Sequence, residues 1–421
     1  MKNNLSRKAT AALESGQARS GGGGIEGMTT QDILKRLIGF PTVSRDSNLA
    51  LIEFVADALR QHGIVSHLIH NDDGCKANLF ATIGPDDRPG IVLSGHTDVV
   101  PVDGQEWSSP PFNMTERDGR FYGRGTADMK GFVASALATC IKASSMDLQV
   151  PLHLALSFDE EVGCLGVRSL IEFLRNVPRK PLLCIVGEPT GMQVAIGHKG
   201  KVAARAICRG REGHSAMAPL ALNAIHLGCD FITALRREQE RLSVGARDDN
   251  YDVPYTTIHV GRMNGGLALN IVPNLCQIDF EIRNIAVDDP ENILGHLTLE
   301  AGRITEKAKC VASEAAIDIR VVNAYPGLDT PATSPEVDFV RSLVGNQSTT
   351  KVAFGTEGGL FDSVAEIPTV ICGPGFMDQG HRPDEFISAE QLIRCDDMLA
   401  NLLMKMTTGP MPWSLPTRSE Q

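Results

Sequence analysis

The sequence lacks three features that would assign it to common classes of protein. It has no excess of basic residues: 40 Lys and Arg against 51 Asp and Glu give a formal net charge of −11, whereas nucleic-acid binding depends on clustered cations. It has no apolar run near the roughly 18 residues that span a bilayer. Its ten cysteines form no C-x-x-C pair, so a zinc ribbon or redox motif is not indicated. We expect no nucleic-acid partner and no membrane embedding.

The cysteines are scattered singly along the chain, most of them among apolar residues. A free thiol in such surroundings behaves as a small hydrophobic side chain. We therefore expect buried, reduced cysteines and a reducing, cytoplasmic location.

The sequence does contain enough apolar residues to form packed cores. The 421 residues, 42% of them hydrophobic, predict two or three domains. Residues 1–27 differ from the rest: they have few apolar side chains, a run of glycines at 21–24 and no apolar segment of the kind found in secretory signals. We expect a disordered leader or an upstream segment there, with Met28 as the functional beginning.

From Thr30 onward, apolar periodicity predicts alternating helices and strands. The expected helices cover 32–38, 48–62, 129–142 and 167–174, and the expected strands cover 78–83, 90–94, 150–157 and 181–186. This order is typical of an α/β protein with a mixed, mostly parallel sheet flanked by helices. In such folds the active site lies at the strand ends. We expect a catalytic domain formed by residues 28–194 and 323–421, the second part ending in a C-terminal tail.

Between 195 and 322 the order of expected elements changes. A strand at 194–208, a helix at 218–239, strands at 255–262 and 275–283, a helix at 290–309 and a strand at 317–323 follow one another. This βαββαβ order is the ferredoxin-like arrangement, a compact unit in its own right. A helix at 334–344 and a strand at 368–372 then resume the first pattern. Residues 195–322 are therefore expected to be an inserted domain.

Two segments with potential metal ligands lie in the first part of the chain. His96 and Asp98 follow an apolar strand, and residues at i and i+2 of an extended segment point to the same side, so Asp98 could orient a ligating imidazole. Asp128 lies among the glycines of GRGTADMKG, where it could cap a helix or approach a bound ion. Asp128 also stands where a G-x-G-x-x-G motif has its third glycine, so we reject the hypothesis of a nucleotide-binding loop. Alone, His96 and Asp98 are more typical of an ordinary loop, and Asp128 fits a helix cap as well as it fits a bound ion.

Three more segments repeat the pattern of an apolar strand followed by a potential ligand. Glu160 and Glu161 follow one strand, Glu188 a second and His381 a third. Adjacent carboxylates repel each other unless a cation or solvent relieves them. Two histidines and three carboxylates predict a site for two divalent ions, and nitrogen and oxygen ligands without thiolate suit zinc, cobalt or manganese. Two-metal hydrolysis is the chemistry that this set favours.

These motifs resemble a family of dinuclear zinc deacylases and peptidases. The resemblance is carried by SGHTDVVPVDGQEW, FYGRGTADMKG, SFDEEVGCLG, VGEPT and GHRPDEFI, and it extends from about Thr30 to Thr407. Within the family, PFNMTERDGRFYGRGTADMKG and FGTEGGLF resemble the acetylornithine deacetylases most closely. The resemblance implies a zinc-peptidase-like catalytic domain, an inserted lid or dimerisation domain, two zinc or cobalt ions per chain and a homodimer.

The resemblance also implies roles for the ligand motifs. His96, Asp128 and Glu188 would bind one ion, and Asp128, Glu161 and His381 the other, with Asp128 as the bridge. Asp98 would orient His96, and Glu160 would be the general base. The peptide bond after Asp128 would be cis.

In the inserted domain the resemblance singles out three residues. His214 would reach the partner subunit's active site and stabilise the oxyanion, while Asn270 and Arg283 would contact the substrate carboxylate. Without the resemblance, His214 would be an exposed loop residue, Asn270 a turn residue and Arg283 a partner of Glu281.

The expected reaction is removal of an acetyl group from an N-acetyl-amino acid, in the first place N2-acetylornithine. Glu357 would face the side-chain amine of that substrate. Desuccinylase, aminoacylase or carboxypeptidase activity is the alternative within the family, although an N-succinyl substrate would need an additional cation. A catalytically inactive amino-acid-binding homologue is the alternative of another class, and the presence of Glu160 disfavours it.

Overall fold

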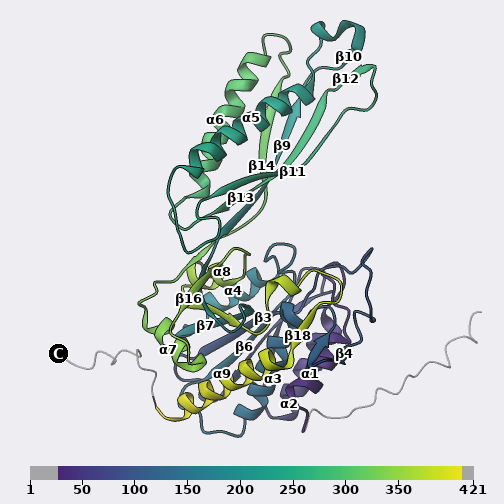
Figure 1. The fold of residues 1–421 in the computed structure, drawn as a ribbon. Helices are drawn as coiled ribbons and strands as arrows, with labels where there is room; N and C mark the ends of the chain where they lie inside the picture. Colours follow the sequence, from purple (N-terminus) through teal and green to yellow (C-terminus); the bar gives the residue numbers. More distant parts are fainter. Residues whose placement is uncertain (1–26, 410–421) are drawn as a thin grey trace, which may run out of the picture.

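The computed structural model describes residues 27–409. The expected leader at 1–27, apart from its last residue, and the end of the expected C-terminal tail lie outside this range. Figure 1 shows the described chain as two units, a broad lower one and an elongated upper one. Across 27–409, no helix combines the length and the apolar character needed to cross a membrane. All ten cysteines are free, and seven of them are buried, as expected from their surroundings.

The lower unit is built on a nine-stranded mixed sheet. Its order is β1 (Ser66–His70), β2 (Ala77–Ile83), β6 (Leu152–Ser157), β3 (Ile91–His96), β7 (Leu183–Pro189), β17 (Thr369–Gly373), β8 (Val194–His198) and β15 (Leu328–Asp329), and β16 (Thr349–Val352) pairs with β8. The central strands β6, β3, β7 and β17 are parallel, and every residue of these four strands is buried. The mixed sheet expected from the sequence is confirmed.

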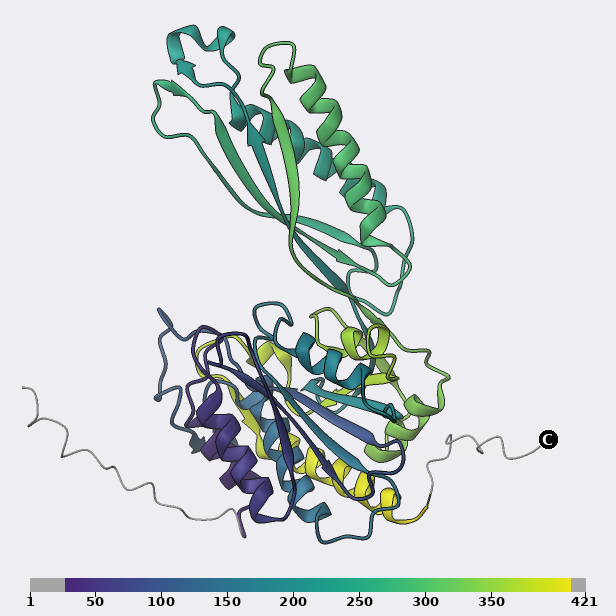
Figure 2. The ribbon, with the colours of Figure 1, turned by 180° about the vertical axis from the view of Figure 1, so that it is seen from behind.

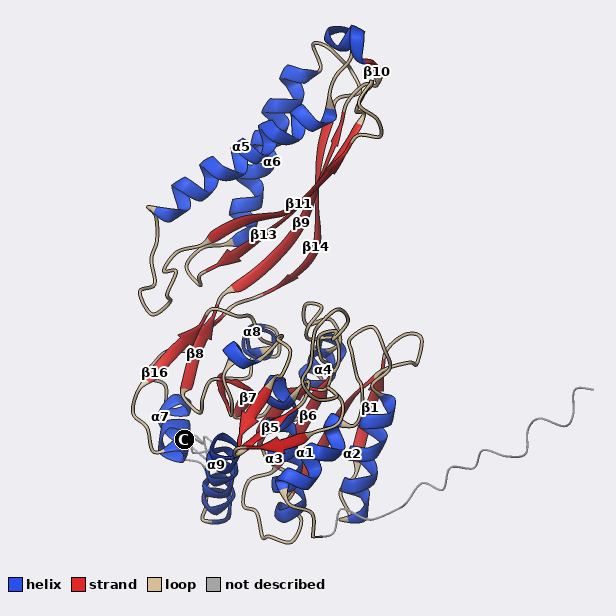
Figure 3. Ribbon diagram, turned by 45° about the vertical axis from the view of Figure 1, so that its right-hand side comes forward, coloured by secondary structure: helices blue, strands red, loops and turns tan. Residues whose placement is uncertain are grey.

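Helices cover both faces of this sheet (Figure 3). One face carries α1 (Thr30–Ile38), α2 (Leu49–Gln61), α3 (Gly131–Ala143), α7 (Pro335–Val344) and α9 (Ala389–Thr407). The other carries α4 (Val167–Arg175) and α8 (Gly358–Ser363). Each helix buries an apolar stripe; in α2, for example, Leu51, Val55 and Leu59 recur at helical spacing. With one layer of helices on each face of the sheet, the lower unit is a three-layered α/β/α sandwich.

The upper unit is a four-stranded antiparallel sheet with two helices on one face (Figure 2). Its elements are β9 (Gly200–Arg209), α5 (Ala224–Ser243), β11 (Thr257–Gly265), β13 (Leu275–Asn284), α6 (Pro290–Ala308) and β14 (Ala316–Tyr325), and its strand order is β11-β13-β9-β14. This is the expected ferredoxin-like βαββαβ arrangement. In β9 and β13 the buried residues largely alternate with half-buried ones, so one sheet face contacts the helices and the other is open.

Two small sheets complete the fold. The strands β10 (Gly213–His214) and β12 (Ile271–Val272) pair at the far tip of the upper unit (Figure 1). The strands β18 (Phe386–Ser388), β5 (Arg120–Tyr122) and β4 (Thr115–Arg117) form a ribbon beside the lower sheet.

Three sequence expectations need correction. The single strand expected at 194–208 is two strands in different sheets, β8 and β9. The helix expected from 218 begins at Ala224, because Pro219 lies in a 3₁₀ turn and Asn223 caps the helix. The helix expected from 129 begins at Gly131, after a π-helical turn at Thr126–Lys130. Because β8 belongs to the central sheet and β14 continues to Tyr325, we propose 200 and 325 as limits of the inserted unit.

Candidate metal centre

The five residues predicted as metal ligands lie together at one edge of the central sheet. His96 ends β3, Glu188 lies near the end of β7 and Glu161 follows β6. His381 comes from the loop after β17, and Asp128 comes from the π-helical turn before α3, where the Asp128–Met129 peptide bond is cis as expected. Neighbouring parallel strands end at the same edge of a sheet, which is why segments far apart in the chain meet there.

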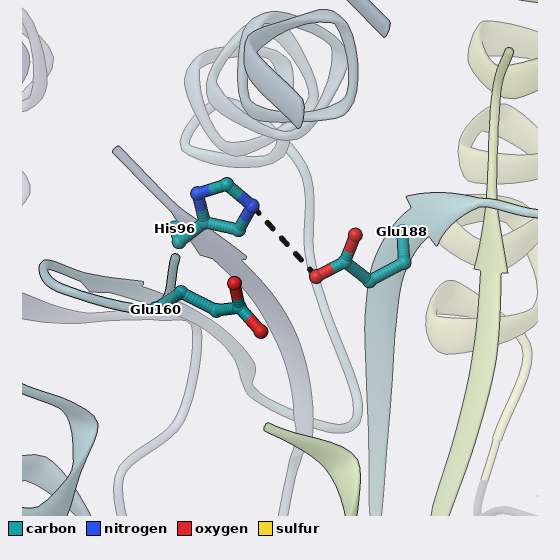
Figure 4. A group of neighbouring side chains, drawn as sticks. All are labelled: His96, Glu160 and Glu188. Atoms are coloured by element: carbon teal, nitrogen blue, oxygen red, sulfur yellow. Dashed lines mark ion pairs between the residues drawn. The ribbon is translucent and has the colours of Figure 1, made fainter. Parts of the chain in front are cut away.

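Asp128 is the centre of the arrangement, because its two oxygens face different histidines. Its Oδ1 lies 3.1 Å from Nε2 of His96, and its Oδ2 lies 3.1 Å from Nε2 of His381. On one side, Glu188 Oε1 lies 3.7 Å from His96 Nε2 (Figure 4). On the other side, Glu161 Oε2 lies 3.0 Å from His381 Nε2. The ligand atoms thus form two groups that share one carboxylate.

Asp98 supports both this cluster and the turn that follows β6. Its backbone carbonyl oxygen lies 2.9 Å from Nδ1 of His96. Its carboxylate accepts hydrogen bonds from the backbone amides of Glu160 and Glu161, at 3.1 and 3.3 Å, and from the hydroxyl of Ser44 at 2.7 Å. The contact with Ser44 and the two amides was not among the sequence expectations.

The carboxylates of the cluster are too crowded to be charged together without a cation. Burial raises the pKa of Glu160 and Glu188 well above the ordinary range and that of Glu161 to about 7, and neighbouring carboxylates add to these shifts. Burial would also raise the pKa of Asp128, but hydrogen bonds with His381 and His96 lower it below its usual value. Hydrogen bonds to Asp128 and Glu161 raise the pKa of His381 to about 10.

The chemistry of these groups fits divalent cations. Two groups of three residues each bring their ligand atoms within 4.8 Å of one another: His96, Glu160 and Glu188 form one group, and His96, Asp128 and Glu161 form the other. These groups share His96, include Glu160 and leave out His381, so they overlap with the two ligand sets implied by the resemblance but do not coincide with them. They offer nitrogen and oxygen and no thiolate, which is the donor set of zinc, cobalt and manganese sites. A cation would also relieve the repulsion that raises the carboxylate pKa values.

The cluster lines one wall of a pocket of about 280 Å³ between the two units. Glu160 is part of this wall, and the upper unit supplies the opposite wall with Lys201, Arg283 and Tyr325. These three residues form one cross-strand row, since Lys201 of β9 pairs with Arg283 of β13 and with Tyr325 of β14. The pocket therefore has an acidic wall, which carries the candidate metal ligands, and a cationic wall.

The two cations of the upper wall share one nearby acid. Arg283 Nε donates to Glu281 Oε1 at 3.2 Å, and Lys201 Nζ lies 3.7 Å from Glu281 Oε2. Arg283 also contacts the hydroxyl of Tyr325 at 3.2 Å. One positive charge is left uncompensated on this wall. Lys201 was not among the predicted site residues, because the register that places it opposite Arg283 is a property of the folded sheet.

Of the predicted site residues, His96 and Asp98 are buried within the cluster and do not line this pocket, and three others lie apart from both. His214 and Asn270 stand at the tip of the upper unit, where the Ser215 amide donates to the carbonyl of Asn270 at 3.0 Å, far from the pocket of the same chain (Figure 1). Glu357 is buried beneath the site, 1% exposed, where it accepts a 2.6 Å hydrogen bond from Ser157. Burial raises the pKa of Glu357 to about 7. The side chain of Glu357 does not face the pocket.

Nitrogen and oxygen ligands gathered in a cleft are typical of one class of protein, the metal-dependent hydrolases. Residues 92–405 match the family model of Peptidase family M20/M25/M40, and the chain belongs to this family.

Named relatives and solved structures agree with this assignment. The chain is 33% identical over 383 residues to the acetylornithine deacetylase of Pasteurella multocida (strain Pm70), covering 89% of this chain and 97% of that protein. It shares its fold with an M20 family metallo-carboxypeptidase from Sulfolobus solfataricus, at TM-score 0.74 and 18% identity over 90% of this chain and 99% of that one. A dinuclear metal binding peptidase of the M20 family from Bacillus subtilis aligns with TM-score 0.63 and 13% identity, over 90% and 97% of the two chains.

Proposed function

We propose that the chain is a deacetylase that hydrolyses the amide of an N-acetyl-amino acid with two divalent ions, zinc or cobalt. The observation that carries the proposal is the position of Asp128, whose two oxygens face His96 and His381 separately. Glu188 would complete the first ion site and Glu161 the second. The two ions, when bound, supply Lewis acidity toward the amide carbonyl and toward water.

Glu160 is the residue best placed to handle the proton. It lines the pocket, its carboxylate lies within 4.8 Å of the ligand atoms of His96 and Glu188, and its backbone amide donates to Asp98. In the reaction, a water oxygen bonds to the amide carbon, the water proton passes to Glu160, and the carbon–nitrogen bond breaks. Glu160 then delivers the proton to the departing amine, so that acetate and a free amino acid are released.

Arg283 is suited to bind the α-carboxylate of the substrate. It lies on the wall opposite the ligand cluster, and its planar guanidinium can form paired hydrogen bonds with a carboxylate. The named relatives make N2-acetylornithine the leading substrate, which would place the reaction in arginine biosynthesis. The free thiols support a reducing cytoplasmic location.

A related second function is favoured by Lys201. This lysine is a second cation on the substrate wall, whereas Glu357, the acid expected to bind the ornithine amine, lies beneath the pocket. A substrate with a second carboxylate, such as an N-succinyl amino acid or an N-acetylated acidic amino acid, would find a partner in Lys201. This desuccinylase-like alternative differs from the leading proposal only in the substrate.

We further propose that the enzyme is a homodimer in which the tip of the upper unit enters the partner's cleft. Around the exposed His214, the side chains of Met217, Leu220, Leu267 and Leu269 are 57 to 102% exposed. A concentration of exposed apolar residues marks an interaction surface. The Ala216 amide donates to Nδ1 of His214 at 3.1 Å, which leaves Nε2–H as a donor for an oxyanion.

A substrate panel tests the proposed function. We expect hydrolysis of N2-acetylornithine with the highest kcat/KM among N2-acetylornithine, N-acetylmethionine, N-acetylglutamate and N-succinyl-diaminopimelate. Lys201→Met should lower kcat/KM at least about tenfold for a substrate whose second carboxylate it binds, by analogy with other charge-assisted contacts. Arg205→Met is the matched control, since Arg205 lies on the same sheet face but pairs with Asp279 outside the pocket. Hydrolysis of none of the four substrates would overturn the proposal, and a preference for the diacids that depends on Lys201 would establish the alternative.

A further inference from the structure

A buried ion pair lies directly behind the candidate metal centre. Nη1 of Arg124 donates to Oε2 of Glu385 at 2.6 Å, and both side chains are 1% exposed. Neither residue lines the pocket or belongs to the candidate ligand groups found in the described chain. Both nevertheless come from the motifs that supply ligands: GRGTADMKG contains Arg124 and Asp128, and GHRPDEFI contains His381 and Glu385.

The carboxylate of Glu385 holds the backbone of the bridging ligand. Its Oε1 accepts hydrogen bonds from the amide nitrogen of Ala127 at 3.0 Å and from that of Asp128 at 3.2 Å. Ala127 and Asp128 are among the first residues of the turn Thr126–Lys130, where backbone amides have no acceptor within the turn and need one from outside it. Glu385 therefore fixes the point from which the Asp128 side chain reaches the site.

The guanidinium of Arg124 holds the turn that carries His381. Its Nη1 also donates to the carbonyl oxygen of Arg382 at 3.3 Å, and its Nη2 donates to Oε1 of Gln105 at 2.7 Å. Gln105 in turn donates from Nε2 to the carbonyl oxygen of His381 at 3.1 Å. His381 has a φ of 60°, a conformation that non-glycine residues adopt only when their surroundings hold it.

We propose that Arg124 and Glu385 are positioning residues for the ion bound by Asp128, Glu161 and His381. Their ion pair connects the two segments that bear Asp128 and His381, and thereby sets the spacing between these ligands. Partners that orient metal ligands typically contribute 10- to 100-fold to metal affinity. The other ion would share Asp128, but its two remaining ligands, His96 and Glu188, lie on β3 and β7 and are held by the central sheet itself. The inference rests on the proposed metal-dependent function.

Two variants test the proposal without removing a ligand. Glu385→Gln keeps the size of the side chain and an oxygen that can accept from the two amides, but it removes the charge that pairs with Arg124. Gln105→Met removes the link between Arg124 and His381, together with the hydrogen bond that Gln105 accepts from Trp107, and leaves the ion pair in place. Gln105 is half-buried, so this variant should fold even if Glu385→Gln does not. Glu314→Gln is the matched control, because Glu314 pairs with Arg211 on the surface of the upper unit.

The measurement is calorimetric titration of the metal-free full chain with Zn²⁺ or Co²⁺, together with Tm before and after metal addition. We expect the wild type and Glu314→Gln to bind two ions, and both site variants to bind one ion at least about tenfold more weakly. The affinity for the other ion should fall less, because Asp128 is its only ligand that the ion pair positions. Because weaker binding to the folded state gives less stabilisation, metal should raise Tm less in the two variants than in the wild type.

Three results would contradict the inference. The ion pair is only structural if both variants bind two ions with wild-type affinity and if their decrease in Tm relative to the wild type is the same with and without metal. If the affinity for both ions falls equally, the assignment of Arg124 and Glu385 to the ion on the His381 side is wrong. If the wild type itself fails to bind two ions, the proposed function falls together with the inference.

Discussion

Nδ1 of His96 lies 2.9 Å from the backbone carbonyl oxygen of Asp98 and 3.6 Å from its carboxylate, so that Nε2 of His96 points toward Asp128. The same carboxylate accepts hydrogen bonds from the backbone amides of Glu160 and Glu161. Asp98 thus orients a predicted ligand and the predicted base together, without lining the pocket itself.

Asp98→Ala should therefore weaken metal binding and catalysis together. The contact of the backbone carbonyl with His96 survives this substitution, but the amides of Glu160 and Glu161 lose their acceptor. We therefore expect a loss of metal affinity of about tenfold, measured by competition with a chelator, and a lower kcat. Asp159→Asn is a suitable control, because Asp159 pairs with Lys76 beside the same turn and belongs to neither ligand group. Equal metal affinity in Asp98→Ala and Asp159→Asn would refute the orienting role.

Glu160→Gln should separate metal binding from turnover. The amide keeps the shape of the side chain but cannot take a proton from water, so kcat should fall at least about 100-fold while the metal content stays at the wild-type level. Steady-state kinetics with elemental analysis of the same sample checks this expectation. Turnover close to that of the wild type would exclude Glu160 as the base.

Complementation between two inactive variants tests the proposed contribution of His214 to the partner subunit. His214→Ala and Glu160→Gln should each be nearly inactive as pure dimers. After subunit exchange, a mixed dimer holds one site with both Glu160 and the partner's His214, so activity should return. If mixing restores nothing although exchange is shown by mass spectrometry, His214 acts within its own chain or not at all.

The buried His153 predicts a pH dependence of folding stability. Burial lowers the pKa of His153 to about 4, against 6.5 for the ordinary side chain. Between these values the unfolded chain binds a proton that the folded chain does not, so stability is complete above pH 6.5 and falls as the pH is lowered toward 4. The contribution between pH 6.5 and 4.5 is on the order of 2 to 3 kcal/mol.

His153→Gln should remove this part of the pH dependence. Urea unfolding of the metal-free protein at pH 6.5 and 4.5 would show a smaller decrease in the free energy of unfolding for His153→Gln than for the wild type. An unchanged decrease would mean that His153 takes up its proton in the folded state as well.

The sequence predicts that the five candidate ligands come together, because each of them lies at or after the end of its own strand or in a turn. Parallel strands of one sheet end at the same edge. The sequence also predicts the βαββαβ unit, whose strands alternate in burial. Helix α9 is absent from the expected elements, although its buried residues Leu392, Cys395, Leu399 and Leu402 recur at helical spacing.

What the sequence does not reveal depends on contacts between distant segments. Arg124 and Glu385 are 261 positions apart, and only the packing of β5 against β18 brings them together. Glu357 stands close to the site in the fold, but its side chain turns toward Ser157 under the sheet edge. The direction of a side chain after a loop is set by tertiary packing, which local patterns do not record.

The central claim is that Asp128 bridges two ions. Its most direct test is the number of metal ions bound per chain, determined by elemental analysis of the purified protein after saturation with zinc or cobalt and removal of excess metal. The account predicts about two ions per wild-type chain and about one in His381→Ala, which loses a ligand on one side of Asp128 only. One ion or none in the saturated wild type would contradict it.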